Sequence, residues 1–197
     1  MTLASKIRRM LGKKTKVSPK MLGYAMVTLA VQHAESLEKA SVLPQRVDGE
    51  ALLCELLRAY FCLASLWVGD HIRGDTSLNL YGAAMLEELR DYPDELGVLV
   101  RGAFADGAAI DDAVACYVRG APSDIDRAAI QENCRLLSLS EDNPLHFFAG
   151  KVHIRTMRIA NVDRRTKEFL LAWTTTAAVV TATARSFFSE IVPVFAE

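Results

Sequence analysis

The chain has 197 residues and a formal net charge of −1 at pH 7, with 51 % hydrophobic and 24 % charged residues. These values exclude wholesale disorder and a globally basic nucleic-acid binder, and the length suits one domain with a sizeable core. With only 11 Gly and 6 Pro, the chain also falls outside the fibrous and low-complexity classes.

Charge is distributed unevenly along the chain. The first 20 residues hold seven Lys or Arg and no acid, whereas the rest hold 16 basic and 24 acidic residues. Residues 2–13 predict a short amphipathic helix, because their apolar residues fall on one narrow face. We therefore expect a basic N-terminal arm over residues 1–17 and a helical bundle over 18–197. The residues of this arm predicted to contact a membrane or a partner are Leu3, Ile7, Arg8, Arg9, Met10 and Leu11.

The first two helices of the bundle have clear start signals. Ser18-Pro19 predicts a helix to about Lys39, since the hydroxyl can cap the helix and Pro suits its first position. Asp48 predicts a second helix to about Gly69, with apolar residues around most of its circumference. We expect Glu55 and Arg58 to be its main exposed pair. Such an apolar helix is usually surrounded by others, so it should lie at the centre of the fold.

Six further helices are predicted over residues 77–91, 93–102, 108–120, 122–139, 143–161 and 163–190. The threonine-rich stretch 174–183 has a composition typical of strands, but the chain offers it no partner strand, so a helix is favoured. In that helix the Thr hydroxyls should bond back to the preceding turn. The uncharged run 169–184 is shorter than a membrane span, which indicates a buried helix. No linker divides the chain, so the predicted fold is an all-α, single-domain bundle of eight or nine helices around 48–69.

Residues 151–167 hold a second basic cluster, in which Asp163 is the only acid and the cations are Lys151, Arg155, Arg158, Arg164, Arg165 and Lys167. Lys151, Arg155 and Arg158 follow the spacing i, i+4, i+7 and share one face, while His153 lies off that face. Arginine matches the geometry of phosphate groups, so these four residues form a candidate anion-binding site. The alternative is that they pair with the acidic segment 86–142, within the fold or across an oligomer. Nucleic acid is disfavoured because no aromatic residue stands between the charges.

Motifs for catalysis, metal binding or cofactor binding are absent from the sequence. It contains no Glu-x-x-His, His-x-x-x-His, Gly-x-Ser-x-Gly, Ser-x-x-Lys, Walker loop or Gly-x-Gly-x-x-Gly. Asp70, His71 and Asp75 form one compact acid–imidazole group, a pattern more typical of helix caps in a solvated loop. We therefore predict no catalytic residue, metal or cofactor, although an enzyme built from scattered residues would leave no such pattern.

Four cysteines, with no Cys-x-x-Cys pair, are set among apolar neighbours. They predict reduced core thiols rather than a zinc site. The N-terminus lacks the apolar run of a secretory signal. Together these features predict a cytoplasmic protein.

Three functional hypotheses remain open. The first is a non-enzymatic interaction or regulatory module, itself oligomeric, that meets an acidic partner through its basic surfaces. The second is a helical bundle that binds an anionic or apolar small molecule, with Arg155, Arg158 and His153 orienting the ligand. In that case the expected lining residues are Met26, Tyr60, Phe61 and Trp67. The third is peripheral attachment to a membrane surface through residues 1–14.

Overall fold

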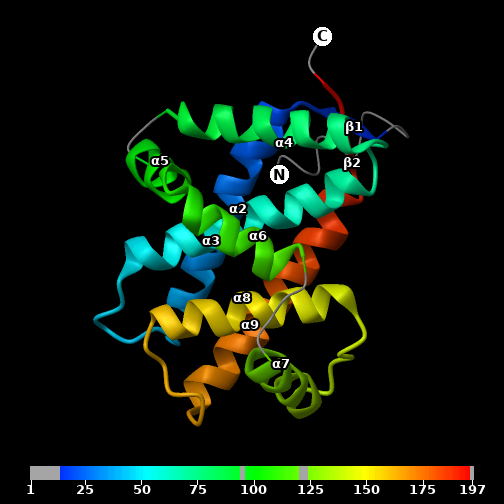
Figure 1. Ribbon diagram of the computed structural model, residues 1–197. Coiled ribbons are helices and arrows are strands. Elements are labelled where there is room, and N and C mark those ends of the chain that lie inside the picture. The colour runs from blue at the N-terminus through cyan, green and yellow to red at the C-terminus, as the bar shows by residue number, and fades with distance from the viewer. Residues whose placement is uncertain (1–13, 94–95, 120–123, 196–197) are drawn as a thin grey trace, which may run out of the picture.

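The computed structural model describes residues 14–93, 96–119 and 124–195, and it confirms an all-α bundle (Figure 1). In chain order these residues form β1 (Thr15–Val17), α2 (Pro19–Lys39), α3 (Gly49–Gly69), α4 (Asp75–Arg90), α5 (Gly97–Ala105), α6 (Gly107–Tyr117), α7 (Asp124–Leu136), α8 (Pro144–Ile159), α9 (Lys167–Thr183), the π-helix η1 (Ala184–Phe188) and β2 (Ile191–Pro193). The predicted helix 2–13, with Leu3, Ile7, Arg8, Arg9, Met10 and Leu11, lies outside the described residues.

Side-chain caps fix several helix starts where the sequence predicts them. Ser18 and Asp48 accept hydrogen bonds from the backbone N–H three residues on, at 3.3 and 3.0 Å. Asn143 accepts one from the N–H of Leu145 at 2.9 Å. Each bond satisfies a donor that has no partner within its own helix.

Helix α5 lies further along the chain than predicted. It covers Gly97–Ala105 rather than 93–102, so Gly102 stands inside the helix and does not end it. The break comes at Asp106, whose backbone is extended and whose carboxylate accepts from Ala108 N at 2.9 Å. The Asp106 residue that caps the start of α6 is thus also the residue at which α5 ends.

The two ends of the described chain meet in a small sheet that the sequence analysis did not predict. β1 and β2 pair in parallel, with Thr15 opposite Ile191, and Thr15 N donates to the carbonyl of Glu190 at 2.9 Å. The predicted helix 163–190 is therefore shorter: α9 ends at Thr183, and η1 leads into β2. Strands of three residues are too short to show a period in sequence.

Helix α3 occupies the centre of the bundle, where it contacts α2, α4, α5, α6 and α8 (Figure 1). By length and composition it resembles a membrane span, but 61 % of its most apolar stretch is buried. In α9 the hydroxyls of Thr174 and Thr175 bond back to the preceding turn at 3.1 and 3.0 Å, as predicted. The apolar runs of α3 and α9 are thus covered largely by other helices of the same chain.

Gly150 allows α8 to pass close to α7 and α9, and this gives a test of the packing. A Cβ at this position would lie 2.6 Å from Ile130 Cγ2 and 3.0 Å from Trp173 Cη2. Because both neighbours are fully buried, Gly150→Ala should lower the free energy of unfolding by about 1–3 kcal/mol. Urea denaturation measures this. Gly82→Ala is the control, since a Cβ there meets nothing within 4 Å, and it should be neutral or stabilising.

Candidate functional site

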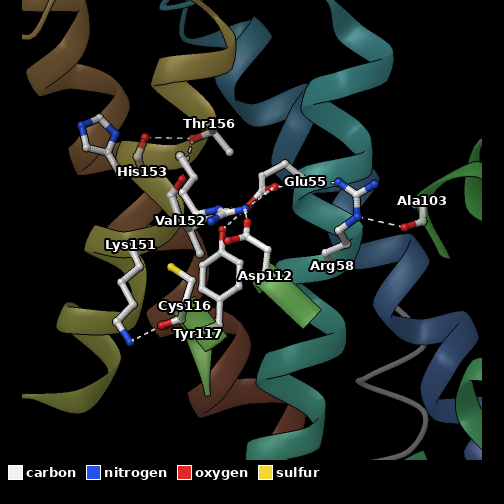
Figure 2. Close-up of polar contacts among 11 residues, drawn as sticks. Glu55, Arg58, Ala103, Asp112, Cys116, Tyr117, Lys151, Val152, His153 and Thr156 are labelled. Carbon is white, nitrogen blue, oxygen red and sulfur yellow. Dashed lines mark hydrogen bonds and ion pairs between the residues drawn. The ribbon is translucent and has the colours of Figure 1, made fainter. Parts of the chain in front are cut away.

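A buried carboxylate lies at the centre of the polar contacts inside the bundle. Glu55 of α3 is 3 % exposed and receives the Arg155 side chain of α8, with Nε–Oε1 at 2.5 Å and Nη2–Oε2 at 3.3 Å. The hydroxyl of Tyr117 in α6 donates to the same Oε1 at 2.5 Å. Figure 2 shows Glu55 and Tyr117 pointing toward one another from α3 and α6. The carboxylate therefore ties three helices together.

The expectation that Glu55 and Arg58 form an exposed pair is wrong. The face of α3 that carries Glu55 meets α6 and α8 instead of water. Arg58 Nη1 is 4.0 Å from Glu55 Oε2, and its Nε donates to the carbonyl of Ala103 at 2.9 Å (Figure 2). Arg58 therefore mainly joins α3 to α5.

Arg155 also reaches the acidic segment 86–142. Its Nη2 donates to Asp112 Oδ2 at 2.7 Å, and the Asp112 side chain is 67 % exposed. Burial disfavours the Arg155 charge, but the hydrogen-bonded carboxylate of Glu55 outweighs this and raises the Arg155 pKa. Arg155 and Asp112 thus pair within the fold, as the alternative to an anion-binding site expects for a member of the basic cluster.

Lys151 is buried as well, but its ammonium donates to a backbone carbonyl rather than to an acid among the described residues. The residue is 6 % exposed, and its Nζ donates to the carbonyl of Cys116 at 2.7 Å, near the C-terminal end of α6 (Figure 2). The ammonium lies 5.1 Å from the centre of the Phe147 ring. Among the residues that the structure describes, no carboxylate comes within 4.0 Å of it. Burial lowers the pKa of Lys151 from its ordinary value of 10.5.

His153 points to the other side of α8, toward α9 (Figure 2). It is fully buried, and its ring packs at centroid distances of 4.3 Å from Phe169 and 5.2 Å from Trp173. Within the described part of the chain neither His153 ring nitrogen has a hydrogen-bond partner, and nor does Nε1 of Trp173. Burial lowers the pKa of His153 to about 3. This histidine is therefore neutral at physiological pH.

His33 of α2 is a second fully buried histidine, and it does have partners. Its Nε2 is hydrogen-bonded to Thr176 Oγ1 at 3.2 Å and its Nδ1 to the Tyr60 hydroxyl at 3.3 Å. Burial lowers its pKa to about 4. The contacts join α2 to α9 and α3, so this ring is a structural link.

Two adjoining hollows follow the uncovered side of α3. The α4 hollow, of about 510 Å³, lies between α3, α4 and α6. The α8 hollow, of about 410 Å³, lies between α3, α8 and η1. Leu66, Asp70 and Val118 line both, so we call the pair the α3 groove. Leu66 is 37 % and Val118 36 % exposed, which places uncovered apolar surface where the hollows meet.

The walls of the α3 groove are mainly apolar and aromatic. The α4 hollow is lined by Phe61, Ser65, Leu66, Val68, Gly69, Asp70, Asn79, Tyr81, Gly82, Ala83, Met85, Leu86, Val114 and Val118. The α8 hollow is lined by Leu63, Leu66, Trp67, Asp70, Tyr117, Val118, Pro144, Leu145, Phe147, Phe148, Lys151, Ala184 and Phe188. A larger hollow beside α7, of about 720 Å³, has mostly polar and charged walls that suit water.

The residues predicted for a site have separate positions in the fold. Lys151 lines the α8 hollow, as does Trp67, and Phe61 lines the α4 hollow. Met26 and Tyr60 are buried in the core, and Arg158 is an exposed residue of α8. The four cysteines are all described and none forms a disulfide. The described residues also contain no group of three or more potential metal ligands.

Sequence reasoning missed Glu55 and the α3 groove. One signal for Glu55 was present, since an acid within a helix apolar on nearly every side must be either exposed or paired. The groove had no comparable signal, because its walls come from five separate elements, α3, α4, α6, α8 and η1.

The chain matches no protein family model, no curated protein and no solved structure. Its function is therefore argued from this geometry alone.

The Glu55–Arg155 contact predicts unequal effects of mutating its two members. Arg155→Met leaves the carboxylate buried with Tyr117 as its main donor, so it should cost about 3–5 kcal/mol in the free energy of unfolding. Glu55→Gln should cost less, since Arg155 keeps Asp112 and its side chain is 22 % exposed. The double variant should lose less stability than the sum of the losses measured for the two single variants. Urea denaturation of the four proteins measures this, and strict additivity would contradict the proposed coupling.

The buried histidines predict a loss of stability in acid. Unfolded histidine binds a proton near pH 6.5, whereas His33 and His153 do so only near 4 and 3 when folded. The stabilisation of the fold by these two neutral rings is therefore complete above pH 6.5 and is lost as the pH falls. Between pH 7 and 5 the free energy of unfolding should drop by about 2 kcal/mol for each ring.

His153→Phe tests this pH dependence without breaking a described hydrogen bond. Because one of the two buried rings no longer titrates, the slope between pH 7 and 5 should be roughly half that of the parent. Gly82→Ala, which removes no titratable group and adds a methyl where nothing lies within 4 Å, should leave the slope unchanged. Denaturation curves at several pH values report the slopes, and equal slopes for the parent and His153→Phe would refute the assignment.

Proposed function

We propose that this protein is a non-enzymatic binding protein that holds an elongated apolar small molecule in the α3 groove. The observation that carries the proposal is the pair of adjoining hollows with apolar walls, about 510 and 410 Å³ in volume. Binding sites for small molecules are typically concave, apolar and of this size, with few polar groups. Packing between helices is a common origin of such sites in helical bundles.

Two polar side chains that line the groove, those of Tyr117 and Lys151, already have hydrogen-bond partners within the fold. The Tyr117 hydroxyl donates a hydrogen bond to Glu55, and the Lys151 ammonium donates one to a backbone carbonyl. Both oxygens of Glu55 already accept from Arg155. A general base needs a free lone pair within reach of the substrate. Glu55 is buried, has both oxygens occupied and lines neither hollow, so it does not supply one.

The other two hypotheses remain predictions. Arg155 pairs with Glu55 and Asp112, and Lys151 contacts Cys116, so the face they share is not an open surface for an acidic protein. An acidic partner would instead meet the exposed cations Arg164, Arg165 and Lys167, or the basic N-terminal arm. Membrane contact through residues 1–14 concerns a segment that is almost wholly outside the described residues. Cytoplasmic location likewise remains a prediction.

Filling the α4 hollow tests the proposed function. Gly82 lines this hollow, and a Cβ there meets nothing within 4 Å, so Gly82→Leu should occupy the space without disturbing the core. The neutral dye N-phenyl-1-naphthylamine should bind the parent with a rise in fluorescence. Its affinity for Gly82→Leu should fall at least about tenfold.

Gly102→Leu is the matched control for this experiment. Gly102 is also an open helical position, in α5, and it does not line the groove. Dye binding to this variant should equal that of the parent. A parent that does not bind the dye, or equal losses in both variants, would overturn the proposal.

A further inference from the structure

We propose that the ligand of the α3 groove is an amphiphilic carboxylate whose head group binds Lys151 in the α8 hollow. This inference rests on the proposed function and names the class of ligand. The geometry behind it is a lysine ammonium that is 6 % exposed and lines an aromatic hollow without a carboxylate within 4.0 Å among the described residues.

The ammonium of Lys151 has capacity for a further partner. A lysine ammonium carries three N–H donors, and one of them is used on the carbonyl of Cys116 at 2.7 Å. The Phe147 ring lies 5.1 Å away and contributes a cation–π contact. Among the described residues the other two donors of this desolvated cation have no hydrogen-bond partner, an arrangement that favours an anionic acceptor.

The position of Lys151 is fixed by contacts of its own helix and of α6. The C-terminal end of α6 carries partial negative charge from its helix dipole, which stabilises a cation next to Cys116. One turn further along α8, Arg155 is held by Glu55 and Asp112. Arg155 does not line the groove, so its charge pairs within the fold while Lys151 supplies the one cation among the described lining residues.

The remaining walls of the α8 hollow suit a hydrocarbon chain. Trp67, Phe148 and Phe188 are each at most 9 % exposed and line it together with aliphatic residues. The other charged residue of the groove is Asp70, which lines both hollows. Its carboxylate repels an anion from the middle of the groove. The head group is therefore directed to Lys151 and the chain toward Leu66 and the α4 hollow.

The test compares two ligands that differ only in the head group. Decanoate and decan-1-ol are titrated against parent protein loaded with N-phenyl-1-naphthylamine, and displacement of the dye gives both affinities. At pH 7.5 decanoate should bind at least about tenfold more tightly than the alcohol, because a hydrogen bond to a charged group adds about this much. In Lys151→Met the preference should vanish, whereas Lys167→Met, at an exposed position outside the groove, should keep it.

A pH titration of the parent tests the same inference without a variant. Burial lowers the Lys151 pKa below 10.5, so a larger fraction of Lys151 is the neutral amine at pH 10. Decanoate binding should therefore weaken at that pH. Alcohol binding should stay constant. If decanoate and decanol displace the dye equally at pH 7.5, or if the preference survives in Lys151→Met, the carboxylate inference fails while the groove is upheld. If the dye itself does not bind, the proposed function fails first.

Discussion

One buried carboxylate constrains the arrangement of the helices around α3. Glu55 loses nearly all of its contact with water in the centre of the bundle, and an unpaired charge there would be very costly. Arg155 and Tyr117 compensate for it, and they come from α8 and α6. The carboxylate thus fixes where these two helices stand relative to α3. Val118 directly follows α6 and Lys151 belongs to α8, so this contact fixes the positions of two groove residues relative to α3.

Helix α8 is buried on two sides in different ways. Toward α3 and α6 it places charged groups that find partners, as Arg155 does. Toward α9 it places the His153 ring among aromatic side chains, with no hydrogen bond in the described part of the chain. The basic face predicted for α8 is therefore mostly not at the protein surface. Of its three cations, Lys151, Arg155 and Arg158, only Arg158 is exposed. Gly150 allows this close packing.

Much of the fold could be predicted from sequence because it depends on local signals. Caps such as Ser18, Asp48 and Asn143, together with runs of apolar residues, fix where helices start and which one is central. The site depends on contacts between distant residues. Glu55 and Arg155 are 100 positions apart, and periodicity shows which faces are apolar but not which stay uncovered. Lys151 was predicted from its charge and spacing, whereas its partner carbonyl in Cys116 is fixed only by the tertiary fold.

The parallel pairing of β1 with β2 has a mechanical consequence. Thr15 is bonded to Glu190, two residues after η1 ends, and Phe188 of η1 forms part of the wall of the α8 hollow. The first described strand therefore lies next to the point where this wall of the groove is anchored. Because the sheet joins Thr15 to the residues that follow η1, a displacement of either strand would be transmitted to this wall of the groove.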